Sequence, residues 1–451
     1  MIMKIGHWSA GLLLIGLLAG CTPVASPNEL LKAPTLNKNQ EEVKKAVLAN
    51  LPQGSSLMIP RNNPGENGAI MEKDITGDGS NEVVAFYKLG EYSLGFIVMQ
   101  KSGNNWKKIG QIEETGQDVD YVAFEDVTGD QEKEIFVSWM ASEDVDKEFG
   151  GYKWKDGQMI QILKTSCKEA IVGDLDKSGI SRAYVFKLDR DKMKAPAEVY
   201  QYDKAISKMK MVQQLELDWS INGYEKVSLG KATKEQNGIF LDSGVGAHSG
   251  QTALLVNKQG KLTQVELTNH DNVMFKPYFS YSKDINNDGI IEISTLVQPI
   301  GTEDLSMVET PWLTEWYQWD GQKSLIKVKE SYDDISNGFQ VNIPNYWAGH
   351  YTVRLASTKE AGTISFLYVD SQGKPSAELF TIDPIKKSEW TNREKELQLQ
   401  RKEYNVIDEN AEHVFIVLYP TDMSRIPADE QPIYRKMLFN LQQLKEAFRK
   451  I

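Results

Sequence analysis

DITGDGSNEVV, residues 74–84, is the stretch that decides the fold. In it, an acidic turn that contains glycine runs into an apolar strand. The pattern returns as DVTGDQEKEIFV from Asp126, as DLDKSGISRAYVF from Asp174 and as DINNDGIIEIS from Asp284. The starts are evenly spaced except for the last interval, which is twice as long, so a further copy is expected there. EKVSLGKATKEQNGIFLDSG fits this place, with Lys231 instead of the leading aspartate. Repetition at a fixed period predicts a fold made of one repeated unit.

A second marker repeats in the same register. After each acidic turn comes a strand that ends in a polar hairpin and leads into one more strand. The hairpin segments are GFIVMQKSGNN, GGYKWKDGQ, VYQYDKAIS, ALLVNKQGK and WYQWDGQK. With the strand before each turn, every repeat holds four short strands. Four antiparallel strands per unit, repeated radially, form a propeller blade. The sequence therefore predicts a mainly β protein with a five-bladed β-propeller-like domain over residues 53–334 that closes into a ring.

The turn pattern Asp-x-x-Gly-Asp-Gly-x-x-Glu, followed by a strand rich in valine and isoleucine, resembles the FG-GAP/VCBS repeat of integrin-like propellers. The resemblance covers roughly residues 68–332. It implies that each turn joins the first two strands of a blade, and that several copies bind calcium.

Calcium takes six to eight oxygen ligands, mostly carboxylates, from a tight turn. The side chains at positions 1, 3, 5 and 9 of a turn and the carbonyl at position 7 have the required spacing. The candidate ligands are Asp284, Asn286, Asp288, the Ile290 carbonyl and Glu292; Asp74, Thr76, Asp78, the Ser80 carbonyl and Glu82; and Asp126, Thr128, Asp130 and Glu134. The Asp284 turn has the best set, because threonine at position 3 is a poorer ligand than asparagine. The alternative is that the acids only cap tight turns through hydrogen bonds to backbone amides.

The third turn is a weaker metal candidate. It offers Asp174, Asp176 and Ser178, but Arg182 stands at position 9 and would put a cation in the site.

The N-terminus reads as a bacterial lipoprotein signal peptide over residues 1–20. Lys4 is followed by the apolar run GLLLIGLLAG, and LAGC, residues 18–21, resembles the lipobox of Gram-positive-type lipoproteins. The resemblance implies cleavage before Cys21 and a diacylglycerol on its sulfur. An ordinary signal peptide and an uncut helix are the alternatives. The lipoprotein interpretation predicts a protein at the extracytoplasmic face of the cell membrane.

Residues 21–52 are expected to form a tether followed by a short helix, because Val43, Ala46, Val47 and Leu51 recur at helical spacing. Cys167 ends an apolar strand pattern and is expected to be a buried, inert thiol.

Residues 335–451 are predicted to form a small α+β domain. GTISFLYVD, AELFTID and EHVFIVLYP read as strands. The last segment reads as one amphipathic helix that presents Met437, Leu438, Leu441, Leu444 and Phe448 on one side.

Catalysis finds little support in the sequence. The histidines make no HExxH spacing, and there is no GxSxG elbow. The loop DSGVGAHSGQ holds Asp242, His248 and Ser249 close together, but triad partners usually meet in space rather than within one short loop. It remains a candidate ligand-binding loop beside its simpler interpretation as a glycine-rich turn. The aromatic segment PWLTEWYQW can either pack in the core or stack on a sugar.

The function expected from the sequence is that of a membrane-anchored, non-catalytic binding or scaffold lipoprotein with a protein or polysaccharide ligand. A formal net charge of -12 argues against nucleic acid as a partner. Two alternatives stay open: a surface enzyme acting on cell-wall or extracellular polymer, and an envelope-assembly factor.

Overall fold

The structure is a computed structural model, which describes residues 38–451 except residues 63–67, 104, 144, 269–273, 357–361 and 421–425. The signal peptide, Cys21 and most of the tether lie outside the described residues. No helix in the described ranges is long and apolar enough to cross a membrane.

The strands of the described ranges form six antiparallel sheets of four or five strands, which confirms a mainly β protein. The first three sheets follow the chain in order. The first sheet consists of β1 (Ser56–Leu57), β2 (Ile70–Lys73), β3 (Glu82–Leu89), β4 (Ser93–Ser102) and β5 (Asn105–Thr115). The second consists of β6 (Asp118–Glu125), β7 (Glu134–Met140), β8 (Lys147–Lys155) and β9 (Gln158–Cys167). The third consists of β10 (Glu169–Gly173), β11 (Arg182–Phe186), β12 (Pro196–Asp203) and β13 (Lys208–Glu216).

The remaining sheets include the end of the chain. The fourth consists of β14 (Gly223–Lys231), β15 (Asn237–Val245), β16 (Ser249–Lys258), β17 (Lys261–Gln264) and β18 (Phe275–Lys276). The fifth consists of β19 (Ile293–Val297), β20 (Leu313–Trp319), β21 (Leu325–Asp334), β22 (Phe339–Asn342) and β28 (Phe448–Lys450). The C-terminal sheet consists of β23 (Tyr351–Leu355), β24 (Ile364–Val369), β25 (Pro375–Lys386), β26 (Tyr404–Glu409) and β27 (His413–Leu418). The helices are α2 (Lys38–Asn50), η1 (Asn345–Trp347), α4 (Trp390–Leu399), α5 (Gln431–Met437) and α6 (Leu441–Ala447).

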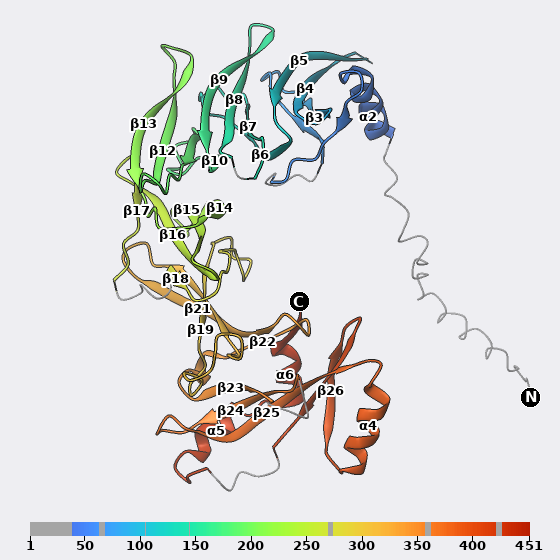
Figure 1. Cartoon of the computed structure of the whole chain (residues 1–451), viewed down its shortest axis with the longest axis vertical. Helices are drawn as coiled ribbons and strands as arrows, with labels where there is room; N and C mark the ends of the chain where they lie inside the picture. Colours follow the sequence, from blue (N-terminus) through green and yellow to red (C-terminus); the bar gives the residue numbers. More distant parts are fainter. Residues whose placement is uncertain are drawn as a thin grey trace, which may run out of the picture.

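The first five sheets follow the sequence repeats. In the first four, the acidic turn joins two neighbouring strands, β2 to β3, β6 to β7, β10 to β11 and β14 to β15. In the fifth, the strand before the turn is reduced to a bridge between Lys283 and Glu292. The polar hairpins join the third and fourth strands, as the register predicted. Figure 1 shows β6, β10 and β14 on the concave side of the series, and β5, β9 and β13 on its outside.

Each repeat sheet is apolar on both faces. The side chains of a strand alternate between the two faces, and successive residues of these strands are apolar. In β3, Val84 and Phe86 belong to the core shared with the second sheet. Val83, Ala85 and Tyr87 belong instead to the core under α2. Every sheet in the series therefore needs a neighbour on each side.

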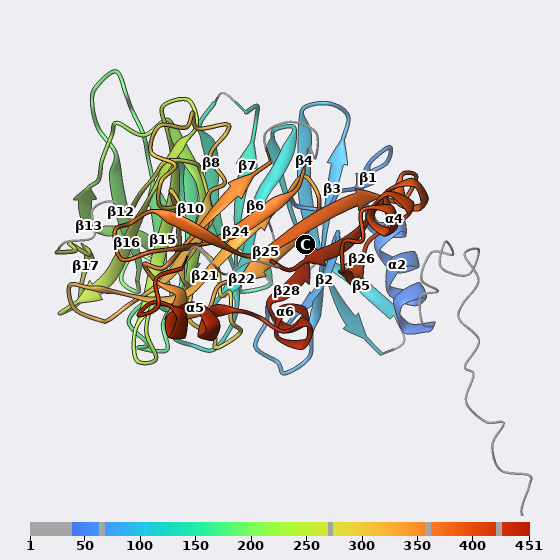
Figure 2. The same cartoon turned by 90° about the horizontal axis from the view of Figure 1, so that it is seen from below.

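The repeat sheets form an open arc, so the prediction of a closed ring is wrong. In the described part of the chain, no core cluster joins the first sheet to the fifth. α2 covers the outer face of the first sheet with Val43 and Val47. At the other end, Leu313 and Tyr332 of the fifth sheet share a core with the C-terminal domain. Figure 1 shows these two caps at the ends of the arc, and Figure 2 shows the C-terminal sheet in front of the repeat sheets.

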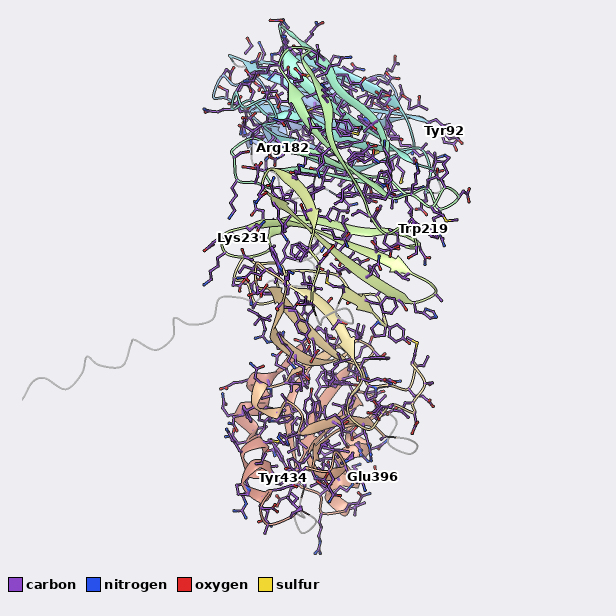
Figure 3. All side chains as sticks on the ribbon, turned by 90° about the vertical axis from the view of Figure 1, so that its left-hand side faces the viewer. Tyr92, Arg182, Trp219, Lys231, Glu396 and Tyr434 are labelled. Carbon is purple, nitrogen blue, oxygen red and sulfur yellow. The ribbon has the colours of Figure 1, made fainter. Side chains whose placement is uncertain are left out.

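The acidic turns of neighbouring repeats contact one another. The Ser181 amide donates to the Asp126 carbonyl at 2.8 Å, and the Ile291 amide donates to the Lys231 carbonyl at 2.9 Å. Gly77 lies so close to the second turn that a Cβ there would come within 2.7 Å of the Glu132 side chain. Figure 3 shows Arg182 and Lys231 at one end of the sheets, and Tyr92 and Trp219 at the opposite end.

The C-terminal domain has the predicted α+β composition, but its last segment is not one helix. The segment divides into α5, α6 and β28. Asn440 starts α6 with a capping box to Gln443, and Leu438 is extended. Phe439, between the helices, packs against Trp347 with ring centroids 5.0 Å apart. A new N-cap and a buried aromatic residue thus override the helical periodicity. β28 then joins the fifth sheet beside β22, so the repeat sheet extends past Asp334 and includes the end of the chain.

Cys167 is fully buried at the end of β9, as predicted. Burial raises the pKa of its thiol to about 12, which leaves it unreactive at neutral pH.

We expect Val47→Asp to destabilise the protein by about 3 kcal/mol, because Val47 is 1% exposed in the core beneath α2 and a carboxylate there has no partner. Chemical denaturation followed by tryptophan fluorescence measures the loss. Leu48→Asp is the matched control, since Leu48 is 52% exposed and its change should stay within about 0.5 kcal/mol. Equal effects of the two variants would show that α2 does not cap the first sheet.

Candidate metal centre

The second acidic turn, residues 126–134, shows how these turns are built. Asp126 accepts hydrogen bonds from the backbone amides of Gly129 at 2.6 Å and Gln131 at 2.8 Å. Glu134 accepts from the Val127 amide at 2.9 Å through Oε2. The first and last acids of the turn therefore hold its backbone in place.

The first turn, residues 74–82, and the fifth turn, residues 284–292, repeat this pattern. Asp74 accepts from the Gly77 and Gly79 amides, and Asp284 from the Gly289 amide. Oε2 of Glu82 accepts from the Ile75 amide at 2.9 Å, and Oε2 of Glu292 from the Ile285 amide at 2.8 Å. The capping role expected of the acids is thus present in all three turns.

In these three turns, the glutamate at position 9 is a buried negative charge. Glu82, Glu134 and Glu292 are all 0% exposed. Their Oε2 atoms are used by the backbone, which leaves Oε1 inside the turn. A buried carboxylate oxygen without a donor or a cation is costly. The three turns meet this need in different ways.

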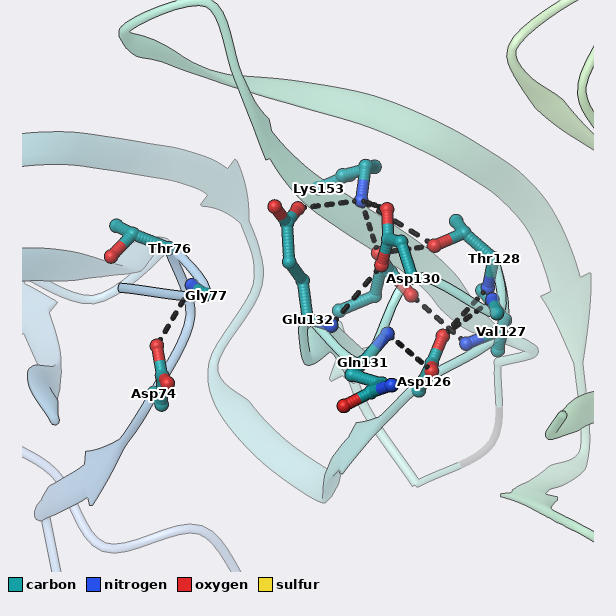
Figure 4. Close-up of polar contacts among 12 residues, drawn as sticks. Asp74, Thr76, Gly77, Asp126, Val127, Thr128, Asp130, Gln131, Glu132 and Lys153 are labelled. Atoms are coloured by element: carbon teal, nitrogen blue, oxygen red, sulfur yellow. Dashed lines mark hydrogen bonds and ion pairs between the residues drawn. The ribbon is translucent and has the colours of Figure 1, made fainter. Parts of the chain in front are cut away.

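The second turn contains its own cation. Lys153, on β8, places its Nζ 2.8 Å from Asp130, 2.9 Å from Glu132 and 2.9 Å from Glu134 Oε1 (Figure 4). The Lys153 side chain is 9% exposed. Burial acts to lower the pKa of Lys153, but the hydrogen bonds to the carboxylates outweigh it and raise that pKa above its usual value. Of the residues predicted as calcium ligands here, Thr128, Asp130 and Glu134 therefore contact an ammonium group, while Asp126 accepts from backbone amides.

The fifth turn holds a carboxylate cluster that forms no ion pair with an ammonium among the described residues, and Lys234 acts on Asp288 only through its charge. Asp284, Asp288 and Glu292 have ligand oxygens within 4.8 Å of one another. Oδ1 of Asp284 is buried and has no hydrogen-bond partner. Burial raises the pKa of Glu292, and the charges of Asp288 and Asp284 raise it further. Gln318, on β20, reaches Asp288 at 2.8 Å and Glu292 at 2.7 Å with a neutral amide.

These residues fit a hard divalent cation. Asn286 lies in the same group and donates to Asp288 at 3.1 Å and to Glu292 at 3.2 Å. Ile290 donates its amide to Asp288. An ion bound here would be held by Asp284, Asn286, Asp288 and Glu292, and it would neutralise their charge.

The first turn also contains polar atoms that lack partners among the described residues. Oε1 of Glu82 and Oγ1 of Thr76 are buried without hydrogen-bond partners. Asp78 caps the Ser80 amide at 2.8 Å and receives the neutral amide of Gln100 at 3.1 Å. Among the described residues, the only group of three acidic ligand atoms within 4.8 Å of one another lies in the Asp284 turn, which the sequence also favoured.

The third and fourth turns lack a free site. In the third, Arg182 pairs with Asp176 at 2.8 Å, as its place in the sequence predicted. In the fourth, Lys231 pairs with Asn237 across the strands, in the place of Lys73 with Glu82 in the first sheet. The sequence comparison of the repeats placed Lys231 at the position of the leading aspartate. This prediction is wrong, because Lys231 takes the position of Lys73, one residue before that aspartate. The turn itself, residues 232–236, is shorter.

The three candidate residues of the ligand loop, Asp242, His248 and Ser249, have different surroundings in the fold. Asp242 is 0% exposed and accepts from Thr252 Oγ1 at 2.5 Å and from Ser282 Oγ at 2.8 Å. His248 is exposed and lies beside Tyr278, while the Ser249 hydroxyl donates to the Pro277 carbonyl. The acid is therefore structural, and the three side chains form no catalytic group.

The buried Asp242 supports a set of aromatic loops that the sequence did not reveal as a unit. Lys276, also 0% exposed, lies 3.4 Å from Asp242 and donates to the Ser280 carbonyl at 2.5 Å. The segment 276–282 is thereby fixed to the fourth sheet. Aromatic side chains lie on this segment and on the loops beside it: Trp219, Tyr278, Phe279, Tyr281 and Trp312.

A second cluster, also missed from the sequence, lies where β6, β8 and β10 begin. Lys147 Nζ lies 2.7 Å from Asp120 and 2.5 Å from Glu169. Burial raises the pKa of Glu169 to about 7, although Lys147 opposes the rise. Its members are far apart in the sequence, and no local motif joins them.

No protein-family model and no curated protein sequence matches the chain. Solved structures resemble it distantly. A protein from Lactobacillus plantarum is 12% identical over 72% of this chain and 95% of that chain, with a TM-score of 0.31. Rhamnogalacturonan lyase YesW is 10% identical over 70% of this chain and 89% of that chain, with a TM-score of 0.31. Sqt1 from Saccharomyces cerevisiae is 11% identical over 71% and 94%, with a TM-score of 0.36.

Calcium should raise the melting temperature of the protein, and a chelator should lower it. An ion that binds only the folded state adds about 2.7 kcal/mol per site at a hundredfold excess over its Kd. Asp288→Ala should reduce the calcium-induced shift measured by differential scanning calorimetry, while Asp174→Ala, in the arginine-paired third turn, should leave it unchanged. Identical melting in calcium and in chelator would show that the turns are held by hydrogen bonds alone.

Proposed function

We propose that this chain is a membrane-anchored extracytoplasmic lipoprotein that acts as a non-catalytic binding module. Its repeat sheets form an FG-GAP/VCBS-like propeller series, and calcium in the first and fifth turns stabilises it. The aromatic side chains of the loop 217–222 and of the segment 276–282 contact the ligand, which is a polysaccharide.

The observation that carries this proposal is the rigid presentation of these aromatic side chains. Trp219 is 39% exposed and Tyr281 46% exposed, on loops of two different repeats. The buried pair of Asp242 and Lys276 fixes the segment that carries Tyr281. Exposed aromatic rings on a fixed scaffold bury area at low entropic cost when they bind.

A polysaccharide suits this surface better than a polyanion. A sugar ring presents an apolar face that stacks on an aromatic ring and hydroxyl groups that accept and donate hydrogen bonds. Polar partners lie beside the rings, since Asp218 next to Trp219 receives the Gln251 amide at 3.1 Å. The net charge of -12 disfavours nucleic acid.

Trp219→Ala and Tyr281→Ala should each weaken binding to a polysaccharide by about 2 kcal/mol, which is roughly thirtyfold in Kd. The measurement is affinity electrophoresis in gels that contain purified cell-wall polysaccharide or a neutral glucan. Tyr92→Ala is the matched control, because Tyr92 is 57% exposed at the same end but on the first sheet (Figure 3). Retention that is equal for all variants would refute a role for the aromatic loops. Retention of the wild type only in a gel that contains an envelope protein would assign the surface to a protein partner.

A second candidate function rests on the Asp120, Lys147 and Glu169 cluster. Convergent ionisable groups at one end of the sheets are what an enzyme acting on cell-wall or extracellular polymer requires. A carboxyl group with a pKa of about 7 can exchange a proton near neutral pH. The same polysaccharide incubations distinguish the two functions, because only an enzyme releases shorter products.

The membrane anchor is tested separately. Cys21→Ala should move the protein from the membrane fraction to the soluble fraction, or leave the uncut precursor, because no acyl chain can be attached. Fractionation followed by immunoblotting reports both outcomes. Normal cleavage with unchanged membrane retention would contradict lipidation at Cys21.

A further inference from the structure

In the first, second and fifth repeats, one residue on the third strand faces the acidic turn. It is Gln100 on β4, Lys153 on β8 and Gln318 on β20. In each of these sheets the residue comes next in register after a cross-strand pair, Val83 with Met99, Ile135 with Tyr152 and Ile293 with Tyr317. It therefore lies across from the glutamate at position 9. We name it the selector residue.

Lys153 shows what a selector residue can do. Its ammonium contacts Glu134 Oε1 at 2.9 Å and Thr128 Oγ1 at 3.5 Å. The corresponding atoms of the first turn, Glu82 Oε1 and Thr76 Oγ1, are buried and have no partner. The oxygens that the second turn gives to an ammonium are thus unpaired in the first turn.

A glutamine as the selector residue is neutral, so it does not compensate the negative charge of the carboxylates in the turn. Gln318 donates to Asp288 and Glu292, but three carboxylates still lie within 4.8 Å of one another. Like charges at this separation repel unless a cation joins them. A glutamine amide can also turn to offer its oxygen to a metal ion, whereas an ammonium only donates.

We propose that the selector residue decides which acidic turns take a divalent cation. Lys153 makes the second turn independent of metal, and Gln100 and Gln318 keep the first and fifth turns open to it. For those two turns the inference rests on the calcium part of the proposed function.

Reciprocal exchanges test this inference. Isothermal titration of the chelator-treated protein with calcium chloride counts bound ions in the wild type, in Lys153→Gln and in Gln318→Lys. Lys153→Gln should bind one more ion than the wild type, and Gln318→Lys one fewer. The control for Lys153→Gln is Lys155→Gln, which removes the same charge on the exposed end of β8. The control for Gln318→Lys is Gln322→Lys, which adds the same charge in the exposed β20–β21 hairpin turn. Both controls should keep the wild-type count.

The outcomes separate the selector from the calcium proposal. No ion in the wild type but one in Lys153→Gln would refute calcium in the first and fifth turns and would support the selector for the second turn alone. An unchanged count in both exchange variants would overturn the selector. Circular dichroism establishes that each variant is folded, and Gln100→Lys takes the place of Lys153→Gln if that variant does not fold. It should then lose the ion of the first turn, and a count equal to that of the wild type would overturn the proposal.

Discussion

The structure depends on one packing constraint, which is that every repeat sheet is apolar on both faces. A strand such as β3 sends Val84 to one neighbour and Val83 to the other, so neither face can remain in water without a large loss of hydrophobic stabilisation. Inside the series, the neighbouring sheets meet this need. At the ends it is met by α2 and by the C-terminal domain, which act like the capping units of repeat proteins. A closed ring would meet it by joining the first sheet to the fifth, and the caps take up the faces that such closure needs.

The acidic turns solve a second problem, which is how to hold a tight turn without leaving a buried charge. A glutamate at position 9 binds the backbone at the start of the turn and is buried by doing so. The remaining oxygen needs a positive charge or a donor. Lys153 supplies an ammonium in the second turn. In the third turn Arg182 replaces the glutamate and pairs with Asp176, and in the fourth the turn is shortened. The repeats therefore keep one backbone design while their electrostatics differ.

Acidic side chains have different partners in different parts of the repeat sheets. At the turn end, the acids are used by the backbone and by neighbouring turns. In the fourth sheet, a buried acid, Asp242, fixes the segment 276–282, which presents the ring of Tyr281 to solvent. Asp242, which lies beside His248 and Ser249 in the sequence, thus serves as an anchor for the segment that carries Tyr281.

The sequence by itself determined the features that repeat along the chain. These are the period, the four strands of each unit, the caps made by Asp74 and Asp126, and the helical spacing of Val43 and Val47. Apart from the period, which comes from comparing copies of the motif, they are local, because each follows from residues a few positions apart. Tertiary structure alone decided the open arc, the burial of Asp242, the break between α5 and α6, and the placement of Lys153 in the second turn. Lys153 lies 19 residues beyond Glu134 in the sequence and meets it only through the register of β7 and β8, where a slip of one residue would turn it to the other face. The character of each turn is set by that cross-strand partner, and for this reason the turn motif alone does not identify a metal site.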